Sequence, residues 1–74
     1  MFEAVRAVIV GHVDCRDVDI TPDTELVKEL RINSLDLVEL VCAFELEFDV
    51  EVPEKDIHKF SKVKDIMQYL EQVT

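Results

Sequence analysis

The stretch LRINSLDLVELVCAFELEFD, at residues 30–49, decides the fold because its apolar residues recur at the spacing of a helix with two apolar faces. On one side the pattern places the large side chains expected to pack into the core, namely Leu37, Leu40, Val41, Phe44 and Phe48. On another side it places a narrower row, the outer stripe, which consists of Leu35, Val38, Cys42 and Leu46. Glu39 borders the outer stripe on one edge, and Glu45 and Asp49 border it on the other. A helix that only had to fold would keep this row polar, so the pattern predicts a docking surface for basic partners.

Ser34 lies at the start of this helix, where a serine most often serves as the N-cap. Asn33 is an equally suitable cap, with Asp36 three residues later as the acidic member of a capping box. If Asn33 caps the helix, Ser34 is the first helical residue and its hydroxyl is free. A phosphate esterified there would be favoured by the unpaired backbone N–H groups and the helix dipole, by roughly 0.3 to 1 kcal/mol. The residues alone therefore leave two interpretations of Ser34, a cap or the carrier of a phosphodiester.

The residues around Ser34 follow a characteristic order. They are Asn33-Ser34-Leu35-Asp36, then Val38-Glu39-Leu40-Val41, and then Phe44-Glu45-Leu46-Glu47-Phe48; other pieces are Ile20-Thr21-Pro22, Glu29-Leu30 and Val52-Pro53. Together these segments resemble acyl carrier proteins, in which an Asp-Ser-Leu triplet opens the second helix and its serine receives 4′-phosphopantetheine from coenzyme A. The resemblance covers most of the chain, and it implies that Ser34 is the attachment residue.

Two positions before Ser34 depart from the pattern of that family. Asn33 replaces the usual aspartate, and Arg31 stands where the family usually has glycine. Both changes make the local charge more positive at the place where a modifying transferase would contact the surface. They favour a carrier that a dedicated transferase modifies, or one that is poorly modified.

The resemblance also implies a function, a non-catalytic carrier whose phosphopantetheine arm holds acyl intermediates as thioesters for separate enzymes of fatty-acid, specialised lipid or polyketide synthesis. Its expected partners are a phosphopantetheinyl transferase and acyl-transferring or acyl-modifying enzymes with basic docking patches. The expected docking residues are Leu35, Asp36, Val38, Glu39, Cys42, Glu45, Leu46 and Val52. The expected acyl-chain pocket consists of Leu40, Phe44, Val52 and Ile57.

Two other classes of function compete with the carrier. The first is an unmodified helical interaction module, in which Asn33 and Arg31 mark a lost attachment site. The second is an enzyme with Ser34 as its nucleophile, which would need a base within hydrogen-bond reach. Only His12 and His58 are available, each on a separate expected element, and nothing in the pattern supports a catalytic triad.

Composition and charge limit the remaining possibilities. The 74 residues predict one domain, residues 1–74, and 49% hydrophobic content with a single glycine predicts a folded chain. The net charge is −9, and residues 32–54 contain seven acidic residues without a Lys or Arg, so nucleic acid is an unsuitable partner. No apolar run approaches the roughly 18 residues of a membrane span. The start of the chain is a poor signal peptide, which predicts a cytoplasmic protein with Cys15 and Cys42 as reduced thiols, and we expect a monomer.

The rest of the chain predicts an all-α fold, a small irregular four-helix bundle of three longer helices and one short helix with a long first loop. A first helix is expected over residues 2–13, a loop over 14–31 with a short helical turn at 24–27, a short helix over 54–59 and a last helix over 62–72. Ile20, Leu26, Val27 and Leu30 are expected to anchor the loop, and Ser61 to cap the last helix. The aspartates at 14, 17 and 19 lack the glycine and closing glutamate of an EF-hand, so a solvated loop is preferred to a calcium site.

Overall fold

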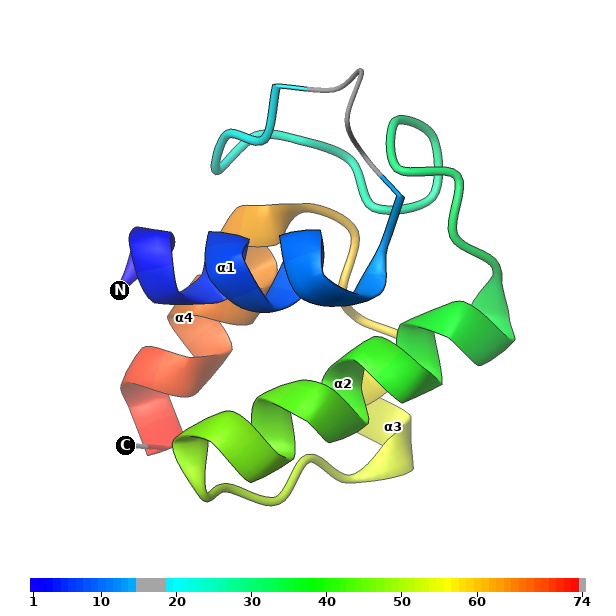
Figure 1. Cartoon of the computed structure of the whole chain (residues 1–74). Coiled ribbons are helices and arrows are strands. Elements are labelled where there is room, and N and C mark those ends of the chain that lie inside the picture. The colour runs from blue at the N-terminus through cyan, green and yellow to red at the C-terminus, as the bar shows by residue number, and fades with distance from the viewer. Residues whose placement is uncertain (15–18, 74) are drawn as a thin grey trace.

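A computed structural model describes residues 1–14 and 19–73 and contains four helices in a small bundle (Figure 1). They are α1 (Phe2–His12), α2 (Ser34–Phe48), α3 (Glu54–Ile57) and α4 (Val63–Val73). The predicted all-α bundle is therefore confirmed, with three longer helices, one short helix and a long first connection. The observed ends of α1 and α4 lie within one residue of those predicted, and α3 ends two residues earlier. Within the described residues, no helix is long and apolar enough to cross a membrane.

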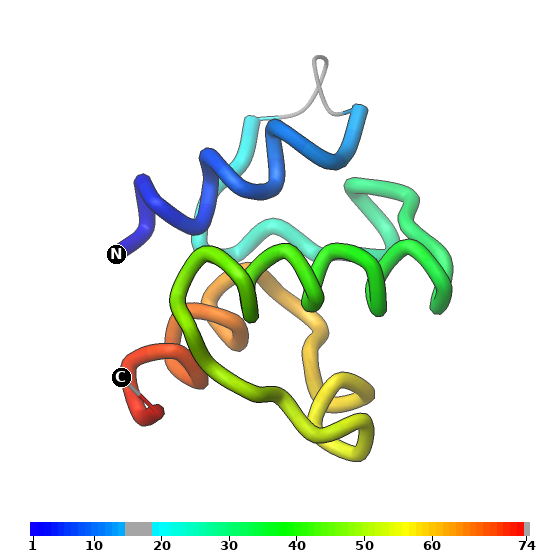
Figure 2. The backbone as a smooth tube through the Cα atoms, turned by 60° about the horizontal axis from the view of Figure 1, so that its bottom comes forward, coloured from blue at the N-terminus to red at the C-terminus, as the bar shows by residue number. Residues whose placement is uncertain are grey.

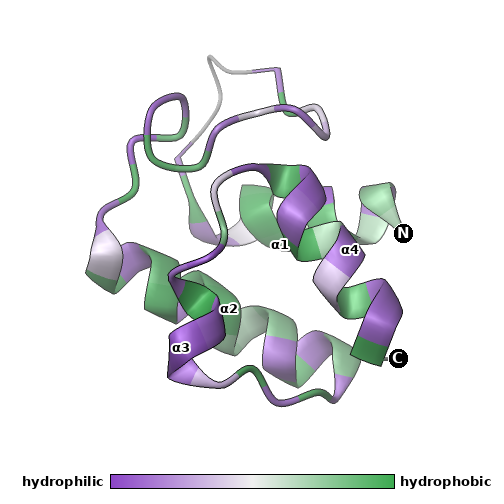
Figure 3. Cartoon of the chain, turned by 180° about the vertical axis from the view of Figure 1, so that it is seen from behind, coloured by the Kyte–Doolittle hydropathy of each residue, from purple (hydrophilic) through white to green (hydrophobic). Residues whose placement is uncertain are grey.

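The core lies where α2 meets α1, α3 and α4. Helix α1 contacts both α2 and α4, and α3 packs on α2. On α2 the predicted core face is confirmed, because Leu37, Leu40, Val41 and Phe44 are all buried. Phe48 is half-buried, with its ring centroid 6.2 Å from that of Phe44. Figure 3 shows that α2 is apolar along most of its length, whereas α3 is mostly hydrophilic.

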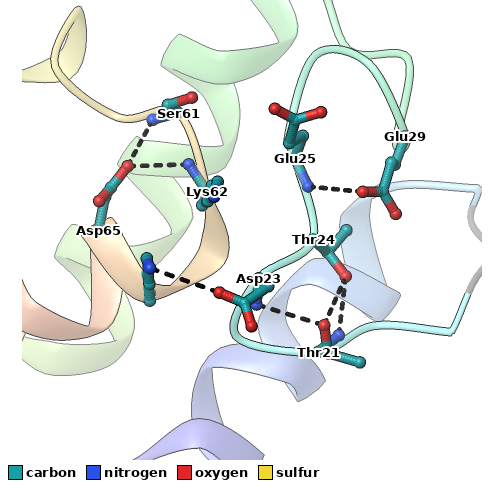
Figure 4. Close-up of polar contacts among 9 residues, drawn as sticks. Thr21, Asp23, Thr24, Glu25, Glu29, Ser61, Lys62 and Asp65 are labelled. Atoms are coloured by element: carbon teal, nitrogen blue, oxygen red, sulfur yellow. Dashed lines mark hydrogen bonds and ion pairs between the residues drawn. The ribbon is translucent and has the colours of Figure 1, made fainter.

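The long connection between α1 and α2 runs beside the start of α4 (Figures 2 and 4), and backbone hydrogen bonds join the two segments. The amide of Leu26 donates to the carbonyl oxygen of Ser61 at 2.9 Å, and the amide of Val63 donates to that of Thr24 at 3.0 Å. These bonds take backbone groups that a helical turn at residues 24–27 would use, so the predicted turn is displaced toward the C-terminus, where the amides of Glu29 and Leu30 donate to the carbonyl oxygen of Glu25 at 3.0 and 3.3 Å. Leu26 anchors the connection as predicted, but Val27 is 59% exposed and was wrongly expected to do so.

The start of α4 also differs from the prediction. Ser61 was expected to cap the helix, but the carboxylate oxygen Oδ2 of Asp65 accepts the amides of Ser61 and Lys62, both at 2.9 Å (Figure 4). The carbonyl of Ser61 is held by Leu26, which keeps this residue in the bridging segment. Asp65 therefore satisfies the amides in front of α4 from within the helix. Of the two cysteines, Cys42 is a free, exposed thiol, and Cys15 lies outside the described residues.

Candidate functional site

The first turn of α2 is closed by a capping box that does not use Ser34. The side-chain oxygen Oδ1 of Asn33 accepts the amide of Asp36 at 2.8 Å, and Oδ2 of Asp36 accepts the amide of Asn33 at 3.3 Å. Asn33 is therefore the N-cap and Ser34 the first helical residue, which excludes the interpretation of Ser34 as the cap. Ser34 is exposed, and its hydroxyl makes no hydrogen bond within the part of the chain that the structure describes. Figures 1 and 2 show this turn at one edge of the molecule.

The chain approaches Ser34 through a residue in an unfavourable backbone conformation. Arg31 has φ 59°, in the left-handed region that favours glycine. Its neighbours Leu30 and Ile32 are both buried at 4% exposure, so the core holds the backbone on either side of it. The glycine that acyl carrier proteins usually have at this position is the only signal for this conformation in the sequence, and it was not predicted from the residues alone.

The outer stripe is exposed over its whole length. Leu35 is 68% exposed and Leu46 is 87% exposed, while Val38 and Cys42 are also at the surface. Glu39 beside them is exposed as well. The structure therefore places Leu35, Val38, Glu39, Cys42 and Leu46 on one accessible face of α2, with Asp36 exposed in its first turn.

Two of the expected docking residues have structural roles. Glu45 is half-buried, and its carboxylate oxygen Oε2 accepts the amide of Val52 at 3.0 Å. Val52 is 9% exposed, so it belongs to the interior and was wrongly expected at the docking surface. The chain between them turns at Asp49, which has φ 54° and ends α2 in the left-handed conformation. Glu45 thus fastens the segment after α2 back onto the helix, a role that the pattern of the sequence did not indicate.

A small cavity lies inside the bundle between α2, α4 and the segment that leads into and out of α3. Its volume is about 10 Å³, and its lining includes Val41, Phe44, Val52, Phe60, Tyr69 and Leu70. Of the expected pocket residues, Phe44 and Val52 line this cavity, while Leu40 and Ile57 are buried in the core beside it. A space of this size is at the lower limit for one water molecule. An acyl chain could enter only if the helices moved apart.

A hydrogen bond between Tyr69 of α4 and Asp56 of α3 closes the bundle beside this cavity. The Tyr69 hydroxyl donates to Oδ2 of Asp56 at 3.1 Å, and Nζ of Lys59 lies 3.3 Å from Oδ1. Burial raises the pKa of Asp56, but the hydrogen bonds from Tyr69 and Lys59 and the lysine charges outweigh it and hold that pKa below its ordinary value. Burial and the neighbouring Asp56 carboxylate raise the pKa of Tyr69. The ring of Tyr69 also meets Phe60 edge to face, with centroids 5.5 Å apart.

The groups around Ser34 suit a tether better than a nucleophile. Among the described residues, no hydrogen bond joins Ser34 to a base, and His12 and His58 are exposed on other elements. Asp36 is engaged with the backbone of Asn33. The described residues also contain no group of three or more His, Cys, Asp or Glu side chains placed to hold a metal ion. An exposed hydroxyl at a capped helix start has the geometry that an esterified phosphate requires.

Comparison with known proteins assigns the family. A family model described as "Phosphopantetheine attachment site" matches residues 3–70. The chain belongs to this phosphopantetheine attachment family. Its cofactor is therefore 4′-phosphopantetheine, attached covalently. The exposed, unbonded hydroxyl of Ser34 fits such an attachment.

Individual members of the phosphopantetheine attachment family are similar to this chain over nearly its whole length. The acyl carrier protein of Helicobacter pylori strain 26695 is 41% identical over 71 residues, covering 96% of this chain and 91% of the relative. That of Akkermansia muciniphila is also 41% identical over 71 residues, covering 96% and 89%. The solved structure of a putative acyl carrier protein from Mycobacterium tuberculosis has a TM-score of 0.86 and 30% identity, covering 96% of this chain and 95% of the other.

Proposed function

We propose that this protein is an acyl carrier and that Ser34 is the residue to which 4′-phosphopantetheine is attached. The observation that carries the proposal is the exposed Ser34 hydroxyl, left free because Asn33 and Asp36 cap α2 between them. The relatives named acyl carrier proteins support the same role. When attached, the cofactor supplies a terminal thiol that holds acyl groups as thioesters for separate enzymes of fatty-acid, specialised lipid or polyketide synthesis.

The residues of the chain would position this arm and present it to partners, without catalysing a reaction. The capping box would keep the first turn of α2 ordered under the attached phosphate. The outer stripe would give partner enzymes an apolar surface, and Glu39 on its edge would attract their basic side chains. A phosphopantetheinyl transferase and acyl-processing enzymes with basic patches are thus the partners that we propose. The cytoplasmic location and the monomeric state remain predictions.

An attached acyl chain would be buried in the interior, in contact with Leu40, Phe44, Val52 and Ile57. Phe44 and Val52 already line a cavity, but its volume of about 10 Å³ leaves no room for a chain. A small bundle has few interior contacts to lose when it opens locally, so such a chain could separate the helices at modest cost.

Intact-mass measurement tests the attachment. The protein is incubated with coenzyme A, Mg²⁺ and a promiscuous phosphopantetheinyl transferase, and the wild type should gain the mass of one phosphopantetheine. Ser34→Ala should gain none. Ser61→Ala is the matched control, because Ser61 is the only other serine of the chain and is also exposed. This control should be modified like the wild type.

The intact mass of the protein recovered from its own host separates the carrier from the unmodified interaction module. If the protein recovered from its own host is folded and always bare at Ser34, Asn33 and Arg31 mark a lost site and the module is the better description. Modification that persists in Ser34→Ala would instead place the attachment elsewhere.

A further inference from the structure

The surface charge changes sign where the chain enters α2. Residues 32–54 carry seven acidic side chains without a Lys or Arg, whereas the exposed Lys28 and Arg31 lie directly before them. Glu29 lies between these two cations in the sequence, and its carboxylate oxygen Oε1 accepts a hydrogen bond from the amide of Glu25 at 3.4 Å. Along the chain, a positively charged segment is therefore followed by a negatively charged one, with Ser34 three residues after the last cation.

Arg31 is the cation closest in sequence to Ser34, and the fold fixes its position. The buried side chains of Leu30 and Ile32 hold the backbone on both sides of it. Arg31 itself is exposed and forms no ion pair among the residues that the structure describes. Three residues of chain span at most about 10 Å, so the Cα atom of Arg31 lies no further than that from the Cα atom of Ser34. The exposed Arg31 is therefore close in space to the residue that a modifying enzyme must reach.

We propose that Arg31 is a specificity-determining residue for the modification of Ser34. Its unpaired charge selects a phosphopantetheinyl transferase that has a carboxylate opposite Arg31 and basic side chains opposite Glu39, and it disfavours a transferase whose docking surface is basic throughout. The reason is that like charges brought together across an interface lower affinity and association rate, whereas opposite charges raise them. This inference rests on the proposed function of Ser34 and adds the chemistry of the partner that serves it.

Four substitutions separate the charge of Arg31 from its backbone conformation. Arg31→Lys keeps the charge, Arg31→Gln removes it, Arg31→Glu reverses it, and all three keep a side chain in the left-handed conformation. Arg31→Gly removes both the charge and the backbone strain. Arg6→Gln on α1 is the matched control, because Arg6 is also exposed and its loss changes the net charge equally.

The experiment measures kcat/KM for the modification of each variant, with coenzyme A and Mg²⁺, by two transferases. With a promiscuous transferase whose docking surface is basic, Arg31→Gln and Arg31→Gly should rise about fivefold and Arg31→Glu further, while Arg31→Lys and Arg6→Gln should match the wild type. With the transferase of the protein's own host, Arg31→Glu should fall about tenfold, and added salt should reduce kcat/KM more steeply for the wild type than for Arg31→Gln.

The possible outcomes distinguish this inference from the proposed function. If every variant is modified by both transferases at the same kcat/KM, Arg31 is not a specificity residue, although the carrier function stands. If only Arg31→Gly differs, the backbone rather than the charge is responsible, and if Arg31→Lys behaves like Arg31→Gln, the positive charge is not what the transferases distinguish; either result overturns the inference. If neither transferase modifies even the wild type, the carrier function itself fails.

Discussion

Asn33 performs the capping task that a serine at a helix start usually performs. Asn and Asp are nearly equal as N-caps, so an asparagine here changes the charge of the attachment segment without weakening the start of α2. The sequence allowed this role to be predicted, because the spacing of Asn33 and Asp36 is that of a capping box and depends only on local chain geometry.

The capping box predicts a stability difference. Asn33→Ala should lower the free energy of unfolding by about 1 kcal/mol, since the amide of Asp36 would lose its acceptor. Asn33→Asp should remain close to the wild type. Urea unfolding followed by circular dichroism measures both, and equal stability of all three proteins would show that the cap contributes nothing.

The backbone at Arg31 predicts a stabilising substitution. A left-handed conformation costs a non-glycine residue roughly 1–2 kcal/mol, and glycine gives back about 0.5–1 kcal/mol through its greater freedom in the unfolded chain. Arg31→Gly should therefore be more stable than the wild type by about 0.5 kcal/mol. Arg31→Ala keeps the strain and is the control; if urea midpoints of the two variants coincide, the left-handed strain is not what matters. The periodicity of apolar residues carries no information about a single backbone dihedral angle, so the sequence pattern did not predict the left-handed conformation of Arg31.

Helix α2 shows how far periodicity predicts an element. Its core face and its outer stripe both follow from residue spacing, and the structure places each as predicted. Periodicity does not distinguish Glu39 from Glu45, which occupy opposite edges of the same stripe. Only the packing of the segment after α2 turns the carboxylate of Glu45 toward the amide of Val52.

This difference predicts that two charge reversals on α2 behave differently. Glu39→Lys should reduce the kcat/KM of a partner enzyme with a basic docking patch and leave the thermal midpoint nearly unchanged. Glu45→Lys should also cost about 1–3 kcal/mol of stability, because the amide of Val52 loses its acceptor. Glu45→Gln keeps an acceptor oxygen and should recover most of that loss. A partner reaction that is indifferent to Glu39→Lys would remove Glu39 from the docking surface.

Long-range contacts explain the local predictions that failed. Ser61 has the residue type of a cap, and residues 24–27 have spacing compatible with a helical turn, but these two segments bind one another through their backbones. The hydrogen bonds join positions more than 30 residues apart, which no local pattern can indicate. The amides of Val63 and Lys64, which a cap at Ser61 would have accepted, donate to the carbonyl oxygens of Thr24 and Pro22 instead.

At the scale of the whole molecule, the link between Asp56 and Tyr69 predicts how the bundle responds to pH. A carboxyl group whose pKa is lower in the folded protein stabilises the fold above its unfolded pKa, and this contribution is lost as the pH falls through the folded pKa. For Asp56 the loss should begin near its ordinary value of 3.8 and continue below it. Below about pH 4, the thermal midpoint of Asp56→Asn should therefore fall less steeply with decreasing pH than that of the wild type. An unchanged acid profile would mean that Asp56 has no net part in it.

The packing of the interior could be predicted only in part. Apolar spacing identified the buried residues of α2, because burial there is a property of the helix face, but Val73 at the end of α4 is 45% exposed although it continues the apolar spacing of that helix. Which buried residues leave a gap between them depends on how side chains from different helices fit, and so Phe60 and Tyr69 line the cavity where Leu40 and Ile57 were expected.

The narrowness of the cavity has a consequence for any acyl cargo. Each methylene that leaves water gains about 0.8 kcal/mol, but the first ones to enter must displace side chains that already touch. Burial would become favourable only once the cargo is long enough for the summed gain to exceed that initial displacement. The interior would then discriminate by chain length: short acyl chains would stay exposed to solvent and accessible to enzymes, and longer chains would be buried and inaccessible to them.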